Sequence, residues 1–288
     1  MGILRAYAEL GRVSNLPTCI SNTLVGLSLG AAVSGDALSP QHAILVSFVI
    51  ALFYFGGMAL NDVADLEWDR QHGPHRPIAA GRVSLQSAMA VIVLCFAFAL
   101  TILDTFAPRA MGYACLLLGA IIAYDLLHKR HPTSVLIMGS CRGLVYLTAA
   151  ATIATVTSMA WWFAAIITFY TMAITIVARA EHLNKLDTRR WIAVAMPIVV
   201  LLAIFLQVDA ISWTVIIGGI LMTIWLSLAA QHVLAKPPQT KNAVLKWLSG
   251  MCLIDAYLLC VLGQPIAALV AGGCFVVTTL GHRKILGT

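Results

Sequence analysis

The stretch "QHAILVSFVIALFYFGGMALNDVADLEWD", residues 41–69, joins a long apolar run to the most polar part of the chain. A membrane-spanning helix needs roughly 20 mainly apolar residues, and residues 41–60 meet that requirement. Four acids then fall within eight residues, at Asp62, Asp65, Glu67 and Asp69. This junction predicts a membrane helix that ends in a group of carboxylates at the water boundary.

The composition extends this interpretation to the whole chain. Of 288 residues, 60% are hydrophobic and 10% are charged, against about 25% charged residues in soluble domains. The mean hydropathy is +0.91. The apolar runs do not alternate with polar residues as barrel strands would, so helices must satisfy the backbone in lipid. We predict one all-α polytopic membrane domain, residues 1–288, and disfavour soluble enzymes, single-span proteins and partners such as nucleic acid.

Hydropathy places nine or ten spans in the chain. The predicted spans cover residues 16–34, 41–60, 83–103, 110–127, 134–153, 159–178, 191–207, 211–231, 243–262 and 265–281. Two long polar loops follow the second and sixth spans, which suggests a diverged repeat of spans one to four and five to eight.

Lys and Arg gather in every second connection and so set the topology. The basic connections are 61–82, the turn at Lys129 and Arg130, 179–190 and 232–242. The other turns hold one base between them, Arg109. By the positive-inside rule, the N-terminus and the acidic loops face the cytoplasm of a multi-pass protein of the inner membrane. The basic Arg283 and Lys284 place the C-terminus on the same side and favour ten spans.

The acidic residues after residue 60 have the spacing of a metal site. Asp62, Asp65 and Asp69 stand at i, i+3 and i+7, which places them on one face of a helix, and Asn61 shares nearly the same face as Asp65. Packed like charges need a cation, and Mg²⁺ binds one or two carboxylates together with water and phosphate oxygens. The alternative is a solvated loop in which acids and arginines pair loosely.

Basic residues near these acids predict that the ligand carries phosphate groups. Arg70, Arg76 and Arg82 are placed to hold phosphate oxygens, so the expected ligand is an amphiphile with a diphosphate head and a lipid tail. Two charges lie within predicted spans, where they mark functional sites by default. Arg142 either reaches the phosphate end of the cavity or extends to the interface, and Asp255 is interpreted as a hydrogen-bonded packing residue.

These residues resemble the UbiA superfamily of intramembrane prenyltransferases. Asn61-Asp62-x-x-Asp65-x-x-x-Asp69 is similar to the signature NDxxDxxxD of that family. Weaker matches are Arg76-Pro77-Ile78, Asn22, Tyr124 and Lys129; "GRVSNLPT", "YDLLHKR" and "CRGLVYLTAA" are most similar to the EboC-like branch. The resemblance implies a helical bundle around a lateral cavity, in which two acidic motifs bind a prenyl diphosphate through Mg²⁺. An aromatic, lipid or polyol acceptor is then alkylated as diphosphate leaves.

The second acidic motif departs from the family pattern. Where the family carries DxxxD, this chain has Glu181 and Asp187, six residues apart. The resemblance implies catalytic roles for both, with Glu181 as the metal ligand beside the first motif. Arg179 and Lys185 would then substitute as phosphate clamps.

Three functions are compatible with the sequence. A Mg²⁺-dependent prenyltransferase is the expected one. A lipid or isoprenoid carrier built on the same fold would use the cavity without breaking a bond, and the degenerate second motif favours that reading. A membrane scaffold would give no reason for the register of the three aspartates. The short, nearly uncharged turns on the other side indicate one-sided access, which favours the enzyme.

Overall fold

The computed structural model describes residues 2–128, 131, 133–182, 186–205 and 211–285, with the backbone alone for 180–182 and 186–190. This part of the chain holds twelve α-helices and no strand, as the sequence predicts. The helices are α1 (Ile3–Leu10), α2 (Leu16–Ser34), α3 (Pro40–Ala64), α4 (Leu66–His72), α5 (Leu85–Phe106), α6 (Met111–Leu127), α7 (Ser134–Ala151), α8 (Ser158–His182), α9 (Leu186–Phe205), α10 (Trp213–Leu234), α11 (Thr240–Val261) and α12 (Pro265–Gly281).

Each of the ten predicted spans coincides with one of these helices, α2, α3 and α5 to α12. In the described part of the chain, eight helices are long and apolar enough to cross a membrane. The other two apolar segments are shorter, Trp191–Phe205 within α9 and Pro265–Gly281. The hydropathy pattern therefore located every long helix.

Local sequence signals define where several helices begin and end. The hydroxyls of Ser39, Ser84 and Ser212 each accept a hydrogen bond from a backbone N–H in the first turn of the following helix. Pro265 occupies the first position of α12, where its missing N–H costs nothing. Gly35 ends α2 with φ +77°, a left-handed conformation that suits glycine.

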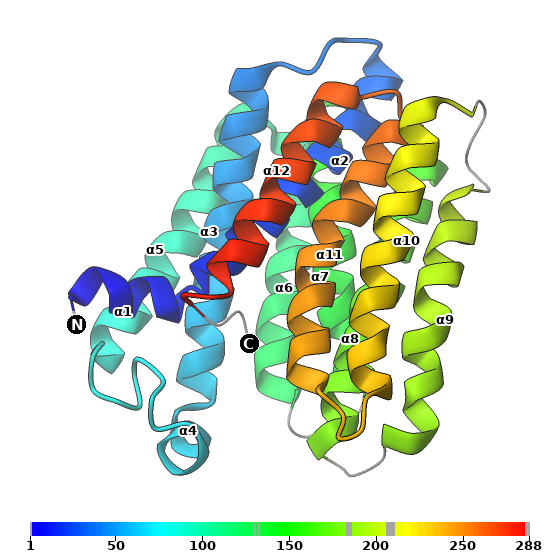
Figure 1. Cartoon of the computed structure of the whole chain (residues 1–288). Coiled ribbons are helices and arrows are strands. Elements are labelled where there is room, and N and C mark those ends of the chain that lie inside the picture. The colour runs from blue at the N-terminus through cyan, green and yellow to red at the C-terminus, as the bar shows by residue number, and fades with distance from the viewer. Residues whose placement is uncertain (1, 129–130, 132, 183–185, 206–210, 286–288) are drawn as a thin grey trace.

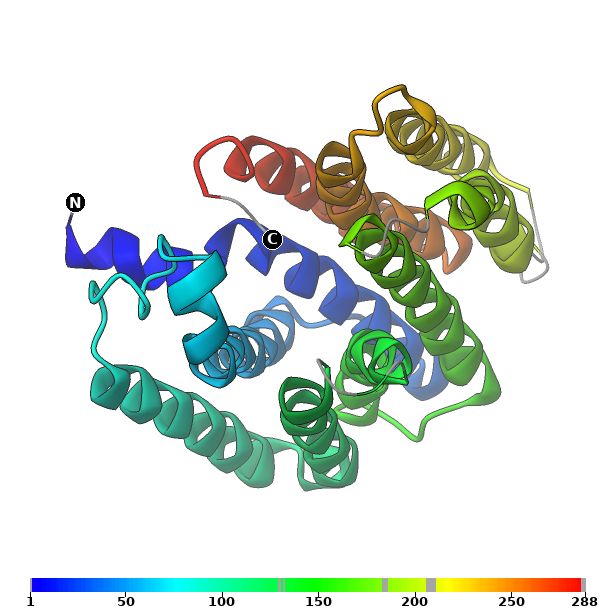
Figure 2. The same cartoon turned by 90° about the horizontal axis from the view of Figure 1, so that it is seen from below.

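Helix α2 lies in the centre of the bundle, as the view from below shows (Figure 2). It contacts α3, α7, α11 and α12, and 72% of the residues in its most apolar segment are buried inside the protein. Close approach to α7 depends on Gly26, because a Cβ atom there would lie 2.4 Å from the carbonyl oxygen of Tyr146. The other long helices run up and down around α2, whereas the short α1 lies across them (Figure 1).

The alternating directions bring several helix ends together at one end of the bundle. The C-termini of α3, α6, α8 and α10 lie at the bottom of Figure 1, together with α4 and the N-termini of α7, α9 and α11. The first acidic motif and the two helix ends that flank residues 183–185, at the end of α8 and the start of α9, therefore lie at this end.

Candidate functional site

The first acidic motif lies where α3 gives way to α4. Asp65 is non-helical, with φ −93° and ψ 0°, and separates the two helices. The prediction that three aspartates share one face of a continuous helix therefore differs from the structure. Asp62 belongs to the last turn of α3, Asp65 to the break and Asp69 to α4. Asp62 contacts arginines and Asp65 contacts His128, so these two carboxylates have different partners.

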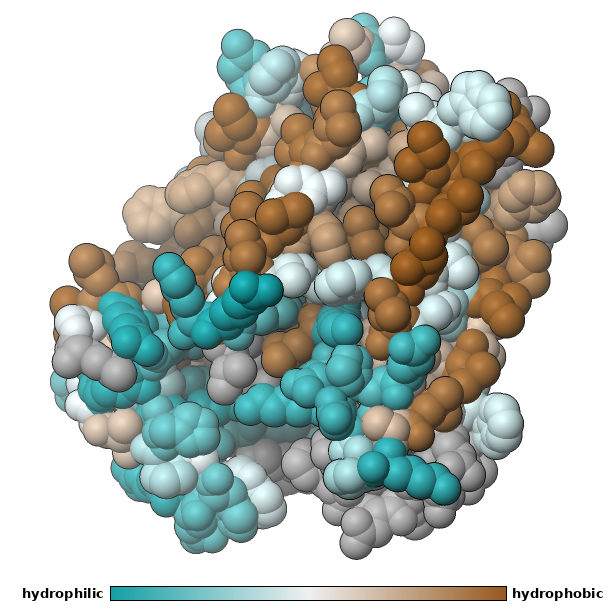
Figure 3. Space-filling view, viewed as in Figure 1, coloured by the Kyte–Doolittle hydropathy of each residue, from teal (hydrophilic) through white to brown (hydrophobic). Residues whose placement is uncertain are grey.

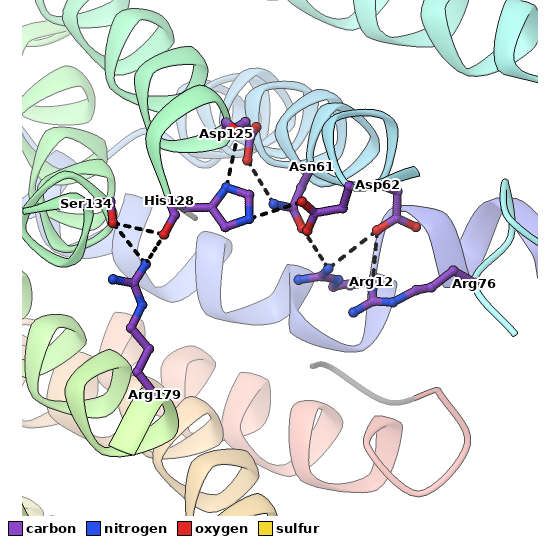
Figure 4. A network of polar contacts seen from close by, with 9 residues as sticks. Arg12, Asn61, Asp62, Arg76, Asp125, His128, Ser134 and Arg179 are labelled. Atoms are coloured by element: carbon purple, nitrogen blue, oxygen red, sulfur yellow. Dashed lines mark hydrogen bonds and ion pairs between the residues drawn. The ribbon is translucent and has the colours of Figure 1, made fainter. Parts of the chain in front are cut away.

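Asp62 faces two arginines that come from different parts of the chain (Figure 4). Its side chain is 2% exposed, and its Oδ1 atom lies 3.2 Å from Arg76 Nη1 and 3.5 Å from Arg12 Nη2. Arg12 also donates to Asn61 Oδ1 at 3.0 Å. Arg76 is therefore beside the acidic motif, as predicted. Arg12 was not predicted, because only the tertiary fold brings residue 12 to residue 62.

A second group of contacts joins α6 to the acidic motif (Figure 4). Asn61 Nδ2 donates to Asp125 Oδ1 at 2.9 Å, and His128 Nε2 lies 3.2 Å from Asp65 Oδ1. The hydrogen bond to Asp65 outweighs partial burial and raises the pKa of His128. The ring of His128 stacks on Tyr124, with centroids 5.2 Å apart. Tyr124 was predicted; Asp125 and His128, its neighbours in "YDLLHKR", were not.

Arg179 joins the end of α8 to the same region. Its Nη2 atom donates to the His128 carbonyl oxygen and to Ser134 Oγ, each at 2.9 Å. Arg179 is thus close to the predicted phosphate end, while Arg70 is exposed on α4. Other predicted residues fall outside what the structure describes: Lys129 and Lys185 entirely, and the side chains of Glu181 in α8 and Asp187 in α9.

Asn22 and Arg142 belong to a buried polar network deeper in the bundle. Arg142 Nη1 donates to Asn22 Oδ1 at 3.1 Å, and Asn22 Nδ2 donates to Asp255 Oδ2 at 2.8 Å. The guanidinium group also lies 5.7 Å from the centroid of the Tyr54 ring. Arg142 therefore points inward rather than to the interface. Asp255 is a hydrogen-bonded packing residue, as expected.

An apolar cavity connects these two regions. Arg142, Asp125 and Tyr124 supply polar groups to its wall. The rest of the wall is Cys19, Ile50, Phe53, Tyr54, Gly57, Met58, Leu117, Ile121, Met138, Cys141 and Val145. The cavity thus combines an apolar interior with the Asp125 carboxylate, which Asn61 links to the first acidic motif, and this suits a ligand with an apolar tail and a charged head.

The donor set at this end fits a hard cation in part. Asp62 Oδ2 is buried and accepts no hydrogen bond from the described residues, and Asp69 is also buried. Carboxylate oxygens are the ligands that Mg²⁺ prefers. In the described part of the chain, however, no three His, Cys, Asp or Glu side chains gather closely enough to form a complete metal cluster. The chain would therefore leave coordination positions for phosphate oxygens and water.

A comparison with protein families decides which family this bundle represents. The model of the UbiA prenyltransferase family matches residues 20–254, which is most of the chain. The chain belongs to the UbiA prenyltransferase family. With eight helices of spanning length and this membership, it is an integral multi-pass membrane protein.

Relatives within the family match part of the chain. A digeranylgeranylglyceryl phosphate synthase from Ignicoccus hospitalis is 34% identical over 123 residues, which are 43% of this chain and 38% of that protein. A synthase of the same name from Methanopyrus kandleri is 38% identical over 94 residues, 33% of each chain. The match therefore spans about a third of the length of these relatives.

Solved structures of UbiA homologues share the fold over nearly the whole chain. The apo structure of a homologue from Aeropyrum pernix K1 has a TM-score of 0.69 at 18% identity, covering 90% of this chain and 98% of that one. A homologue from Archaeoglobus fulgidus bound to GPP and Mg²⁺ has a TM-score of 0.62 at 14% identity, covering 90% and 99%. The UbiA fold is thus conserved well beyond recognisable sequence similarity.

Proposed function

We propose that this UbiA protein transfers a prenyl group from a prenyl diphosphate to a lipid-type acceptor at the cytoplasmic side of the membrane. The observation that carries the proposal is the apolar cavity whose wall includes the Asp125 carboxylate, which accepts a hydrogen bond from Asn61 of the first acidic motif. The relatives named digeranylgeranylglyceryl phosphate synthases support a lipid acceptor. The Archaeoglobus homologue bound to GPP and Mg²⁺ supports a prenyl diphosphate donor.

The first motif would hold Mg²⁺ through Asp62, Asp65 and Asp69, and Glu181 would complete the site from the second motif. When bound, Mg²⁺ neutralises the negative charge that develops on the departing diphosphate. Basic side chains would bind the phosphate oxygens directly. The proposed set is Arg70, Arg76 and Arg179, together with Lys129 and Lys185. Asp187 would act with Glu181 as part of the second acidic motif.

The cavity would protect the reaction once the carbon–oxygen bond breaks. The allylic cation reacts with water unless the surrounding walls exclude it, and this cavity is lined mainly by apolar side chains. The ring faces of Tyr54 and Tyr124 would stabilise the cation by cation–π attraction. Asn22 would act indirectly, because it is fully buried and orients Arg142.

The test is binding of geranyl diphosphate to the purified protein with and without Mg²⁺. We expect binding to require Mg²⁺ in the wild type and to be lost in Asp65→Asn. The matched control is Asp104→Asn, an exposed position at the far end of α5, which should bind like the wild type. Glu181→Gln tests the second motif separately. If the wild type binds no prenyl diphosphate with Mg²⁺, the proposed reaction is wrong.

A further inference from the structure

A second pocket lies beside the carboxylates, between α1, residues 75–82 and the segment after α12. It is a hollow that opens to the surface. Its wall carries the cationic side chains of Arg5, Arg12, Arg76, Arg82 and Lys284, with the carboxylate of Glu9. We refer to it as the cationic pocket. Figure 3 shows hydrophilic surface on this lower part of the molecule, below the hydrophobic surface of the helices.

The charges in the cationic pocket do not cancel one another. Arg5 Nε donates to Glu9 at 3.0 Å, and Arg82 donates to the same carboxylate. Burial raises the pKa of Glu9, but the hydrogen bonds from Arg82 and Arg5 outweigh it and lower that pKa overall, so Glu9 stays ionised. Even with Asp62 counted, five cations meet two carboxylates. The pocket therefore keeps positive charge for an anion.

Tertiary contacts build this pocket from distant parts of the chain. His282 and Asn15 are joined by a buried hydrogen bond of 2.6 Å, which anchors the segment that carries Lys284. Arg12 holds a left-handed backbone conformation with φ +42°, which is costly for a residue with a side chain. Its Nε atom is buried and makes no hydrogen bond with the described residues. Arg12 is therefore held in a strained position while retaining an unused donor.

The cationic pocket shares a wall with the carboxylate end of the cavity. Arg12 and Arg76 line the pocket and both contact Asp62. On α1, Ile3 and Leu4 next to Arg5 are 65% and 83% exposed. A short amphipathic helix with exposed apolar residues beside basic ones suits the membrane interface. A ligand with an anionic head and an apolar chain would match this arrangement.

We propose that the cationic pocket binds the phosphate headgroup of the lipid acceptor, an inference that rests on the proposed prenyl transfer. Guanidinium groups bind phosphate through paired, directed hydrogen bonds, which favours arginine in such a role. With its head here, the acceptor lies directly beside the proposed diphosphate site, separated from it by Arg12, Asp62 and Arg76. The pocket thus selects an acceptor that carries a phosphate over an uncharged one.

The experiment compares two probes that differ only in the phosphate, a 1-O-alkylglycerol 3-phosphate and the same 1-O-alkylglycerol. We expect the purified protein to bind the phosphate form at least tenfold more tightly. Arg82→Gln and Lys284→Gln should each reduce that preference at least threefold. Lys284 is exposed, so its variant is expected to fold. The control Lys241→Gln removes the same charge at an exposed site on α11 and should retain the preference. Equal affinity for the two probes overturns the inference.

Further measurements separate this inference from the reaction itself. Geranyl diphosphate with Mg²⁺ should bind to Arg82→Gln and Lys284→Gln as it does to the wild type. If the donor binds while the phosphate preference is missing, prenyl transfer stands and the acceptor pocket is wrong. If the donor does not bind but the alkylglycerol phosphate does, prenyl transfer is wrong. If phosphatidylglycerol or inorganic phosphate competes as well as the alkylglycerol phosphate, the pocket binds any phosphate and its assignment to the acceptor is overturned.

Discussion

The polar network around Asp255 allows a quantitative test of what holds the cavity in shape. Asp255 is fully buried in α11 and accepts hydrogen bonds from Ser21 Oγ at 2.5 Å, from Asn22 Nδ2 at 2.8 Å and from the Tyr146 hydroxyl. These partners belong to α2 and α7, so one side chain joins three helices. The substitution Asp255→Leu keeps a branched side chain of four heavy atoms but removes every acceptor.

Three lost hydrogen bonds set the size of the effect. Hydrogen bonds between membrane helices contribute about 0.6 kcal/mol on average and at most about 1.7 kcal/mol. Asp255→Leu should therefore lower the free energy of unfolding by about 2 to 5 kcal/mol. Asp255→Asn keeps an acceptor oxygen, and its amide can donate to a hydroxyl oxygen of Ser21 or Tyr146. We expect it to cost less than about 1 kcal/mol, on the scale of one such bond.

The assay is unfolding by SDS titration in mixed micelles, with the folded fraction followed by tryptophan fluorescence. Asp104→Leu and Asp104→Asn serve as matched controls at an exposed position and should change the free energy of unfolding little. The reasoning is refuted if Asp255→Leu unfolds like the wild type. It is equally refuted if Asp255→Asn lowers the free energy of unfolding as much as Asp255→Leu. The stabilising property of Asp255 would then be its negative charge, acting on Arg142, rather than its hydrogen bonds.

Two further perturbations have defined outcomes. The raised pKa of His128 means that its pair with Asp65 stabilises the fold fully below about pH 6.5 and is lost as pH rises through the higher folded pKa. The stability difference between wild type and His128→Gln should therefore shrink on titration from pH 6 to pH 8, and a difference that grows would contradict the pair. Gly26→Ala places a Cβ 2.4 Å from the Tyr146 carbonyl oxygen and should cost roughly 1–3 kcal/mol or more in SDS unfolding. The control Gly112→Ala adds a Cβ with no atom within 4 Å and should leave the free energy of unfolding unchanged or raise it. If the two variants are equally destabilised, tight packing against α7 is not the cause of the Gly26→Ala effect.

The long helices could be predicted because each depends on a local property of its own sequence. Twenty apolar residues satisfy their backbone as a helix whatever lies around them. The predicted segments 16–34 and 265–281 coincide with α2 and α12 for this reason. Hydropathy also identified the polar break after residue 60, since carboxylates at that density are excluded from the lipid core.

The partners of the site residues depend on tertiary structure and could not be predicted in the same way. Arg12 contacts Asp62 across 50 residues of sequence, and Asn61 contacts Asp125 across 64. No local pattern records such a pairing. The sequence around Tyr124 did indicate further site residues. Asp125 and His128 follow Tyr124 by one and four residues at the C-terminal end of the same helix, α6. The helix break at Asp65 could not be predicted, because residues 61–69 contain no glycine or proline.

The geometry of Asp62 explains how one carboxylate can serve both proposed sites. Both arginines approach its Oδ1 atom, while its Oδ2 atom is buried without a hydrogen bond from the described residues. A cation bound at Oδ2 would therefore leave the contacts with Arg12 and Arg76 in place. The two guanidinium groups would keep their positions on the wall of the cationic pocket whether or not the donor is bound. Asp62 would thus set the spacing between the two phosphate-bearing heads, while Asp65, which faces His128, belongs to the donor side alone.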